Sequence, residues 1–220
     1  MTQNTSHAVM QQRAEAHDSL DDFPTPPWAT RALMEHVIKP LVAPHYKMIP
    51  SWSVWEPACN RGYMAKPLTE YFDRWHFSDI HDYGWNGQNR VVDFLYPGSE
   101  GDVGPGEPDW IITNPPFRLA AQFAHRCVQV GPRMGFALLT RIAFLEGVGR
   151  YEELFSVAPP NVVAQFTERV PMVKGRHDPE ASTATAYCWL VWGGRLDRLG
   201  KTDFMWIPPC RRQLQKPTDA

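Results

Sequence analysis

The chain has 220 residues, of which 43% are hydrophobic and 12% aromatic, so it can bury the core of one domain and is not an unfolded polypeptide. Its net charge of −2 and its pI near 6.4 are not typical of a protein that holds nucleic acid mainly through phosphates. No apolar run approaches the roughly 20 residues of a membrane helix and no signal-peptide pattern is present, so we expect a cytoplasmic protein without membrane contact.

The first elements along the chain are an arm, a helix and a strand-loop-helix unit. Residues 1–22 are polar and lack an apolar period, which predicts a flexible N-terminal arm. Pro27 is placed to begin a helix that runs to Ile38 and ends at Lys39-Pro40. A strand is then predicted over residues 52–56, a loop over 57–62 and a helix over 63–72.

The rest of the chain alternates between apolar strands and helical stretches, with a Gly- and Pro-rich loop over residues 98–108. This alternation predicts an α/β fold with a mostly parallel sheet and helices on both faces. Residues 23–210 would form this single domain, and 211–220 a C-terminal tail. Strands are predicted at 75–80, 91–92, 109–113, 135–140, 162–167 and 186–192, and helices at 119–130 and 148–157.

Cysteine and histidine residues are scattered along the chain. Cys59, Cys127, Cys188 and Cys210 form no CxxC pair, which predicts free thiols rather than a zinc site or a redox couple. The eight histidines show no paired ligand spacing, so we expect no metal.

The segment Asn114-Pro115-Pro116-Phe117 directly follows the predicted strand 109–113, where a parallel sheet usually carries its chemistry. Two consecutive prolines remove two backbone donors and fix φ near about −65°, so they hold a stiff turn. The turn offers an amide side chain, the Pro115 carbonyl and an aromatic ring, a set that suits a planar ring bearing an exocyclic amine. In isolation, Asn-Pro-Pro is more often a simple loop breaker.

Acidic residues follow three of the other predicted strands: Glu56, Asp79 and Asp93. In a doubly wound sheet a carboxylate at the end of the second strand, the position of Asp79, typically binds the hydroxyls of a ribose. The loop after Glu56 keeps Gly62 but lacks the GxGxxG pattern, which argues against NAD. Carboxylates at this place favour a positively charged cofactor.

Together these motifs resemble those of S-adenosylmethionine-dependent DNA adenine N6-methyltransferases in the gamma arrangement, especially the small bacteriophage and prophage forms. The resemblance implies a Rossmann-like class I methyltransferase fold, with a seven-stranded sheet whose last strand is antiparallel. A phage-encoded enzyme would act in the host cytoplasm. The motifs that carry the resemblance are Thr25-Pro26-Pro27, Glu56-Pro57-Ala58-Cys59, Asp79, Asp93-Phe94 and Asn114-Pro115-Pro116-Phe117.

The resemblance also implies a binding site for S-adenosylmethionine. Asp79 would hold the ribose hydroxyls, and Ile80 would pack on the cofactor adenine. The family usually has glycine where this chain has Asn60, and asparagine tolerates a positive φ better than most residues. The expected cofactor contacts are Thr25, Trp28, Glu56, Pro57, Ala58, Asn60, Gly62, Asp79, Ile80, Asp93, Phe94 and Asn114.

For the substrate, the resemblance implies that the Asn114 side chain and the Pro115 carbonyl accept hydrogen bonds from the target amine, beside Pro116 and the stacking ring of Phe117. A base inside a duplex cannot reach such a pocket, so a DNA substrate implies base flipping. Of the 103 residues that follow Phe117 (220 − 117), most are needed to complete the sheet, so we expect short or relaxed sequence specificity. Expected DNA contacts are Phe117, Arg118, Arg141 and, on the 171–179 segment, Lys174 and Arg176. The 171–179 segment is as readily an ordinary hairpin connection. Arg118 and Arg141 could instead pair with acidic side chains.

Three functions stay open on the sequence: a DNA adenine methyltransferase, an enzyme of the same fold acting on RNA or a protein glutamine, and a non-catalytic binding module. The residues predict no oligomeric state and no target sequence.

Overall fold

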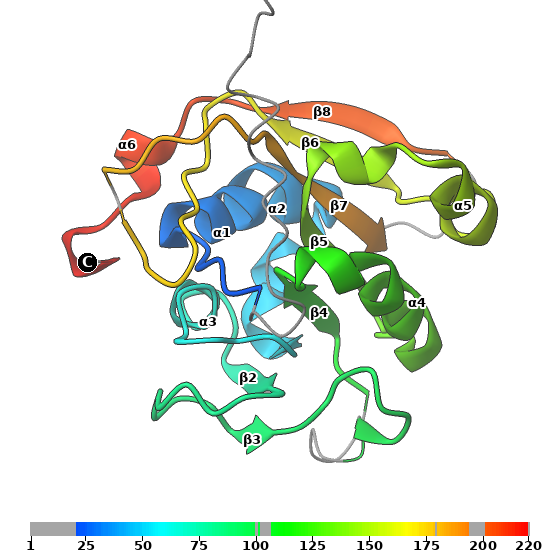
Figure 1. Cartoon of the computed structure of the whole chain (residues 1–220), viewed down its shortest axis with the longest axis horizontal. Coiled ribbons are helices and arrows are strands. Elements are labelled where there is room, and N and C mark those ends of the chain that lie inside the picture. Colours follow the sequence, from blue (N-terminus) through cyan, green and yellow to red (C-terminus); the bar gives the residue numbers. More distant parts are fainter. Residues whose placement is uncertain (1–20, 100, 102–106, 179, 194–200, 220) are drawn as a thin grey trace, which may run out of the picture.

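The computed structural model describes residues 21–99, 101, 107–178, 180–193 and 201–219. Within them, eight strands form one sheet in the order β3-β2-β1-β4-β5-β7-β6-β8, with helices on both faces (Figure 1). The expected α/β fold is therefore confirmed, but the sheet has eight strands rather than seven. The arm predicted over residues 1–22 lies outside the described residues up to residue 20, as does part of the predicted 98–108 loop.

All seven predicted strands form, each within one residue of the expected bounds. β1 to β5 pair with one another in parallel, whereas β7 is antiparallel to both β5 and β6. The strands are β1 Ser53–Glu56, β2 Arg74–Asp79, β3 Arg90–Val91, β4 Trp110–Thr113, β5 Gly135–Arg141, β6 Val162–Phe166, β7 Tyr187–Gly193 and β8 Asp203–Ile207.

The strand predicted as the last, residues 186–192, is β7 and is antiparallel as expected, but an eighth strand that was not predicted follows it. β8 follows the antiparallel β7 in the chain and pairs parallel with β6 at the edge of the sheet. Its Phe204 and Trp206 are 55% and 62% exposed, whereas Ile207 is buried. An edge strand with large apolar side chains on its open face does not show the usual alternation of apolar and polar residues, and this is why the pattern was missed.

The first predicted helix is longer than expected, because it continues past Pro40. α1 (Pro27–Leu33) runs into a π-helical turn, Met34–Ile38, and then into α2 (Lys39–Leu41). A proline inside a regular α-helix clashes with the carbonyl four residues earlier and leaves it without a donor. The wider π-helical turn just before Pro40 relieves that conflict, so the proline does not end the helix.

The helix predicted over residues 63–72 shrinks to one turn, α3 (Ala65–Leu68). Pro67 has no N–H to donate to the carbonyl four residues earlier, so the helix does not begin at residue 63. At its other end, the hydroxyl of Thr69 donates to the Lys66 carbonyl at 2.8 Å, which ends the turn. The other predicted helices form as a 3₁₀ turn, Phe117–Leu119, leading into α4 (Ala120–Val130), and as α5 (Val148–Arg150) leading into a π-helical turn, Tyr151–Phe155.

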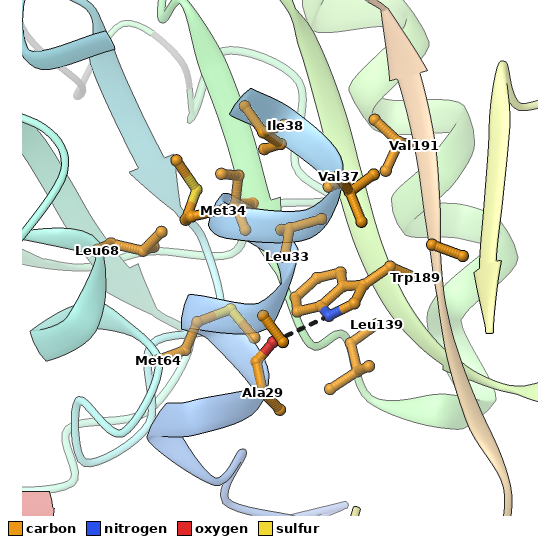
Figure 2. Close-up of a cluster of buried hydrophobic side chains, with 14 of the residues drawn as sticks. Ala29, Leu33, Met34, Val37, Ile38, Met64, Leu68, Leu139, Trp189 and Val191 are labelled. Atoms are coloured by element: carbon orange, nitrogen blue, oxygen red, sulfur yellow. Dashed lines mark hydrogen bonds between the residues drawn. The ribbon is translucent and has the colours of Figure 1, made fainter. Parts of the chain in front are cut away.

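Two hydrophobic clusters lie on opposite faces of the sheet, because successive strand residues point to opposite sides. Figure 2 shows the cluster under α1, in which the indole N–H of Trp189 donates to the Ala29 carbonyl at 3.2 Å. Burying each large side chain there contributes roughly 1.5–3 kcal/mol. The labelled members of this cluster are Ala29, Leu33, Met34, Val37, Ile38, Met64, Leu68, Leu139, Trp189 and Val191, all at most 2% exposed.

Residues 211–219, which we expected as a tail, pack against the domain. α6 (Arg211–Leu214) lies near α1 (Figure 1), and Arg31 of α1 is only 4% exposed. The Arg31 guanidinium donates to Glu70, to Asp219 and to the Leu214 carbonyl, with distances of 2.7–3.2 Å. Leu214 and Asp219 are thus tied to the first helix.

All four cysteines are buried and free, as predicted. Among the residues described, none of the helices combines the length and apolar composition that crossing a bilayer requires.

Candidate active site

A cavity of about 520 Å³ opens at the carboxyl ends of β1, β2 and β4, where the strand order reverses between β1 and β4. Open α/β sheets bind their ligands at this topological switch point, and the volume is typical of small-molecule sites. The cavity brings together residues from all five predicted motifs. Predicted site residues in its wall are Thr25, Glu56, Pro57, Ala58, Asn60, Asp79, Ile80, Asp93, Phe94, Asn114, Pro116 and Arg118.

Some predicted residues do not line the cavity. Trp28 is buried and packs edge-on against Phe166, with ring centroids 5.6 Å apart. Gly62 has a φ of +82°, and any side chain there would collide with the ring of Trp85, so it shapes the loop from behind. The remaining predicted residues outside the wall are Pro115, Phe117, Arg141, Lys174 and Arg176.

Glu56, the last residue of β1, is 1% exposed, and its Oε2 atom has no hydrogen-bond partner. Burial, and secondly the nearby carboxylate of Asp79, hold the pKa of Glu56 well above its ordinary value. A buried carboxyl without a partner is costly to keep, so a cationic or hydrogen-donating ligand in the cavity would satisfy it.

Asp79, the last residue of β2, points its carboxylate at the loop that follows β1. Its Oδ2 accepts a hydrogen bond from the Asn60 backbone N–H at 2.9 Å, and its Oδ1 accepts one from the His81 N–H at 3.0 Å. Burial raises the pKa of Asp79, whereas these two hydrogen bonds oppose the rise. Each carboxylate oxygen can accept a second hydrogen bond, so Asp79 can still receive a pair of hydroxyls.

The segments that follow β2 and β3 provide an apolar and a polar surface. Ile80 is 54% exposed and offers its side chain to the cavity, whereas Phe94 is 2% exposed and packs against Trp55 and Phe123 at centroid distances of 5.0 Å. Asp93 is exposed, and its Oδ1 accepts a hydrogen bond from the Leu95 N–H at 2.9 Å. The buried ring of Phe94 therefore packs behind this part of the wall, and Asp93 and Ile80 form its accessible surface.

Asn114 stands at the end of β4 with its amide fixed in one orientation. Its Nδ2 donates to the Phe23 carbonyl at 2.9 Å and contacts the Met172 sulfur at 3.8 Å. Its Oδ1 has no partner. The amide nitrogen is thus engaged, and the amide oxygen remains available as an acceptor.

Phe117 lies beside the cavity rather than in its wall. Its half-buried ring packs against Phe23 and Tyr187, with centroids 5.3 Å and 5.7 Å away. The Arg141 guanidinium lies over the Phe117 ring at 4.3 Å. Three aromatic rings and a planar cation therefore gather next to Asn114.

The basic 171–179 segment approaches the same mouth, as far as it is described, to residue 178. Val173 and Arg176 form an isolated antiparallel bridge, and the Gly175 N–H donates to the Asp22 carbonyl at 2.8 Å. Arg176 pairs with Asp178 at 3.2 Å. The segment is therefore a tight turn beside residues 21–23.

Several cavity residues were missed on the sequence. Asp21, Phe23, Tyr63, His81 and Tyr83 also line the wall. Phe23 could have been found from its position just before the Thr25-Pro26-Pro27 motif. His81 and Tyr83 gave no such signal, because they reach the cavity from a loop with no periodic pattern. Among the described residues, no three His, Cys, Asp or Glu side chains are grouped to hold a metal ion.

The fold is that of a Rossmann-like class I methyltransferase, with an eighth strand added at the edge. A scan of protein-family models gave no match, and neither did a sequence comparison with curated proteins. The likeness is therefore to solved structures, and at the identities found it concerns the fold alone.

Two such structures are modification proteins of restriction systems. A modification subunit assigned to a type I restriction enzyme of Vibrio vulnificus YJ016 matches with a TM-score of 0.55 and 18% identity, over 90% of this chain and 49% of that chain. The M protein of the type I restriction enzyme EcoKI matches with a TM-score of 0.57 and 12% identity, over 87% and 49%. The chain thus spans about half the length of these two proteins.

Proposed function

We propose that the protein transfers a methyl group from S-adenosylmethionine to the N6 amine of adenine in DNA. The observation that carries the proposal is that Asn114, with an unpartnered amide oxygen, and Glu56, with an unpartnered carboxyl oxygen, line one cavity. The first atom suits an N–H of the target amine, and the second suits the positive charge of the cofactor. The modification proteins that share the fold add support for a DNA substrate.

The cavity suits S-adenosylmethionine by its chemistry. Asp79 would accept hydrogen bonds from the ribose hydroxyls, Ile80 would cover one face of the adenine, and Asp93 would accept from its edge. Buried carboxyl groups oppose an anionic pyrophosphate and favour a cation, which fits a sulfonium. When bound, the cofactor supplies an electrophilic methyl group, and its sulfur keeps the electron pair of the broken S–C bond.

Asn114 would prepare the amine for attack. The lone pair of an adenine N6 amine is delocalised into the ring, so the amine is a poor nucleophile. Hydrogen bonds from the two N–H groups to the Asn114 oxygen and to the carbonyl of Pro115, a residue outside the cavity wall that would have to shift toward the amine, would favour a pyramidal nitrogen with an available lone pair. The same acceptors would stabilise the positive charge that develops on nitrogen, and the surplus proton would leave to water.

The rings beside Asn114 would receive a flipped base. Phe117 lies next to the proposed target position, and stacking on an aromatic ring contributes on the order of 1–3 kcal/mol per base, which offsets part of the cost of extrusion. We expect Arg118, in the wall, and Arg141, over the Phe117 ring, to contact the flanking phosphates. With few basic residues at the mouth, we expect short or relaxed sequence specificity.

The decisive comparison uses three substrate classes. The purified protein is incubated with methyl-labelled cofactor and, separately, with duplex DNA, with RNA of the same sequence, and with a glutamine-containing protein. We expect label in DNA only. Label in RNA or protein instead would contradict the DNA assignment, and failure to bind the cofactor by calorimetry would favour the non-catalytic binding module.

Asn114→Ala tests the proposed role of the amide. We expect the variant to lose DNA methylation by at least about a hundredfold, because an acceptor that acts on the transition state is removed, and to bind the cofactor nearly as wild type does. Asn86→Ala is the matched control, since Asn86 is exposed and lies outside the cavity wall. Wild-type turnover of Asn114→Ala would remove the proposed role.

A further inference from the structure

Asn60, at the position where the resemblance leads us to expect glycine, has a side chain that is fully engaged. Its φ is +51°, so it adopts the left-handed conformation that favours glycine. Its Nδ2 donates to Asp22 Oδ1 at 2.6 Å, and its Oδ1 accepts from the Arg61 N–H at 2.6 Å. A glycine would adopt this backbone with less strain but could not bind Asp22.

Asp22 is held from three directions and is only 7% exposed. Besides Asn60, the Arg61 guanidinium donates to Asp22 Oδ2 at 2.8 Å, and the Gly175 N–H donates to the Asp22 carbonyl at 2.8 Å. The charge-assisted bond to Arg61 is of the stronger class. Asp22 therefore joins the cofactor loop to the turn at 173–176.

The residue after Asp22 touches the catalytic turn. The Phe23 carbonyl accepts the hydrogen bond from Asn114 Nδ2 at 2.9 Å, and this bond decides which end of the amide is left unpaired. If the Phe23 carbonyl moved away, the Asn114 amide could rotate and present its NH₂ group to the target amine, which would repel it. Correct orientation of Asn114 thus depends on where Phe23 is held.

We propose that Asp22 is a positioning residue for methyl transfer. By binding Asn60 and Arg61, it fixes Phe23 so that the oxygen of Asn114 faces the target amine, and it couples the cofactor loop to the catalytic turn. The proposal rests on the proposed function. It also gives Asn60 a role, since Asn60 is one of the two side chains that hold Asp22.

Two substitutions test this role: Asp22→Ala removes the carboxylate, and Asn60→Gly removes one of its donors while keeping the backbone conformation. We expect each to lower the single-turnover rate constant, measured with saturating cofactor and DNA, by roughly 10- to 100-fold, because small misplacements of a reacting group have effects of this size. The dissociation constant for DNA should stay within twofold of the wild-type value. The double variant should be no slower than the slower single variant, because Asn60 is expected to act through its bond to Asp22.

Hydrogen exchange at the Gly175 amide is a second readout that does not depend on activity. Because Gly175 donates to the Asp22 carbonyl, its exchange should be faster in both variants than in wild type. The control is Asp73→Ala, which changes an exposed acid outside the cavity wall. The melting temperatures of the two variants should match that of the control. If Asp22→Ala fails to fold, Asn60→Gly carries the test.

Two results would overturn the proposal. One is faster Gly175 exchange with a rate constant within twofold of wild type, which would mean that the segment is released without consequence for transfer. The other is unchanged Gly175 exchange in the variants, which would mean that Asp22 does not hold the segment. A wild-type protein that methylates no DNA would instead contradict the proposed function, and the exchange data would still decide whether Asp22 holds residues 21–23.

Discussion

At the scale of single residues, Glu56 and Asn114 share one feature. Each has a buried side-chain oxygen that accepts no hydrogen bond. Proteins rarely keep such atoms, because burying a polar group without a hydrogen bond costs about 1–3 kcal/mol. Two of them in one cavity wall indicate that the ligand completes the site. Under the proposed function, the carboxyl oxygen of Glu56 would face the cationic cofactor and the amide oxygen of Asn114 would face the target amine.

The raised pKa of Glu56 gives a prediction for cofactor binding. Burial, and then Asp79, raise the pKa of Glu56 well above its ordinary value in the free protein. A cationic ligand favours the ionised carboxylate and lowers that pKa. At pH values between the pKa of the complex and that of the free protein, binding should release a proton, and affinity should increase as the pH rises through this window.

Calorimetric titration in two buffers with different ionisation enthalpies measures the released proton. Glu56→Gln should abolish the buffer dependence, whereas Glu146→Gln, an exposed acid outside the cavity wall, should keep it. Proton uptake on binding, or a release that persists in Glu56→Gln, would show that Glu56 is not the group that responds to the cofactor.

At the scale of elements, the ion-pair network of Arg31 joins the C-terminal residues to α1. Arg31 on α1 is 4% exposed and binds Asp219, which is 7% exposed, and Glu70, which is 30% exposed. Removing one member of a buried ion pair leaves the other charge buried without a partner. The network therefore fastens α6 and the residues after it to the first helix.

Arg31→Ala should lower the free energy of unfolding by about 3 kcal/mol or more, measured by urea denaturation, because the Asp219 carboxylate would lose its partner in a buried position. Lys39→Ala is the comparison, since Lys39 pairs with Glu35 at a site where both side chains are 34% exposed, and it should cost less than about 1 kcal/mol. Equal effects of the two substitutions would mean that the Arg31 network does not stabilise the fold.

The sequence predicted elements best where one physical cause dominates. The strands of the sheet interior are buried on both faces and read as continuous apolar runs, so β4 and β7 were found within one residue. Helix ends depended on a balance of weaker effects: Pro40 is tolerated because of a π-helical turn, and Pro67 cuts a helix short. Neither outcome is visible in apolar periodicity.

The candidate site was predictable to the extent that strand ends position it. Asp79 and Asn114 follow strands that meet at one edge of the sheet, and both line the cavity. The contacts made by Asp22 and Phe23 were not predictable, because they come from an irregular segment that is placed by tertiary contacts with Asn60, Arg61 and Asn114.

For the whole molecule, the net charge of −2 sets an expectation for the proposed binding of DNA. The expected phosphate contacts are four basic side chains near the mouth of the cavity. Each phosphate contact contributes about −0.9 to the slope of log affinity against log salt concentration. We therefore expect a slope no steeper than about −3.6, which is shallow for a DNA-binding protein. The four side chains are Arg118, Arg141, Lys174 and Arg176.

Fluorescence anisotropy with duplex DNA at several salt concentrations measures this slope. Lys174→Ala should make the slope shallower by about 0.9, the contribution of one phosphate contact. Lys47→Ala should leave the slope unchanged, because Lys47 is an exposed lysine in another surface depression. A slope twice as steep as expected would show that basic residues elsewhere on the molecule contact the DNA.

The account depends most on the chemical identity of the product. DNA from cells that express the wild-type protein, in a host without adenine methylation of its own, is digested to nucleosides and analysed by mass spectrometry. The account predicts N6-methyladenine with the wild-type protein and none with Asn114→Ala at equal expression. Absence of N6-methyladenine with the wild-type protein, or equal amounts with the variant, would contradict it.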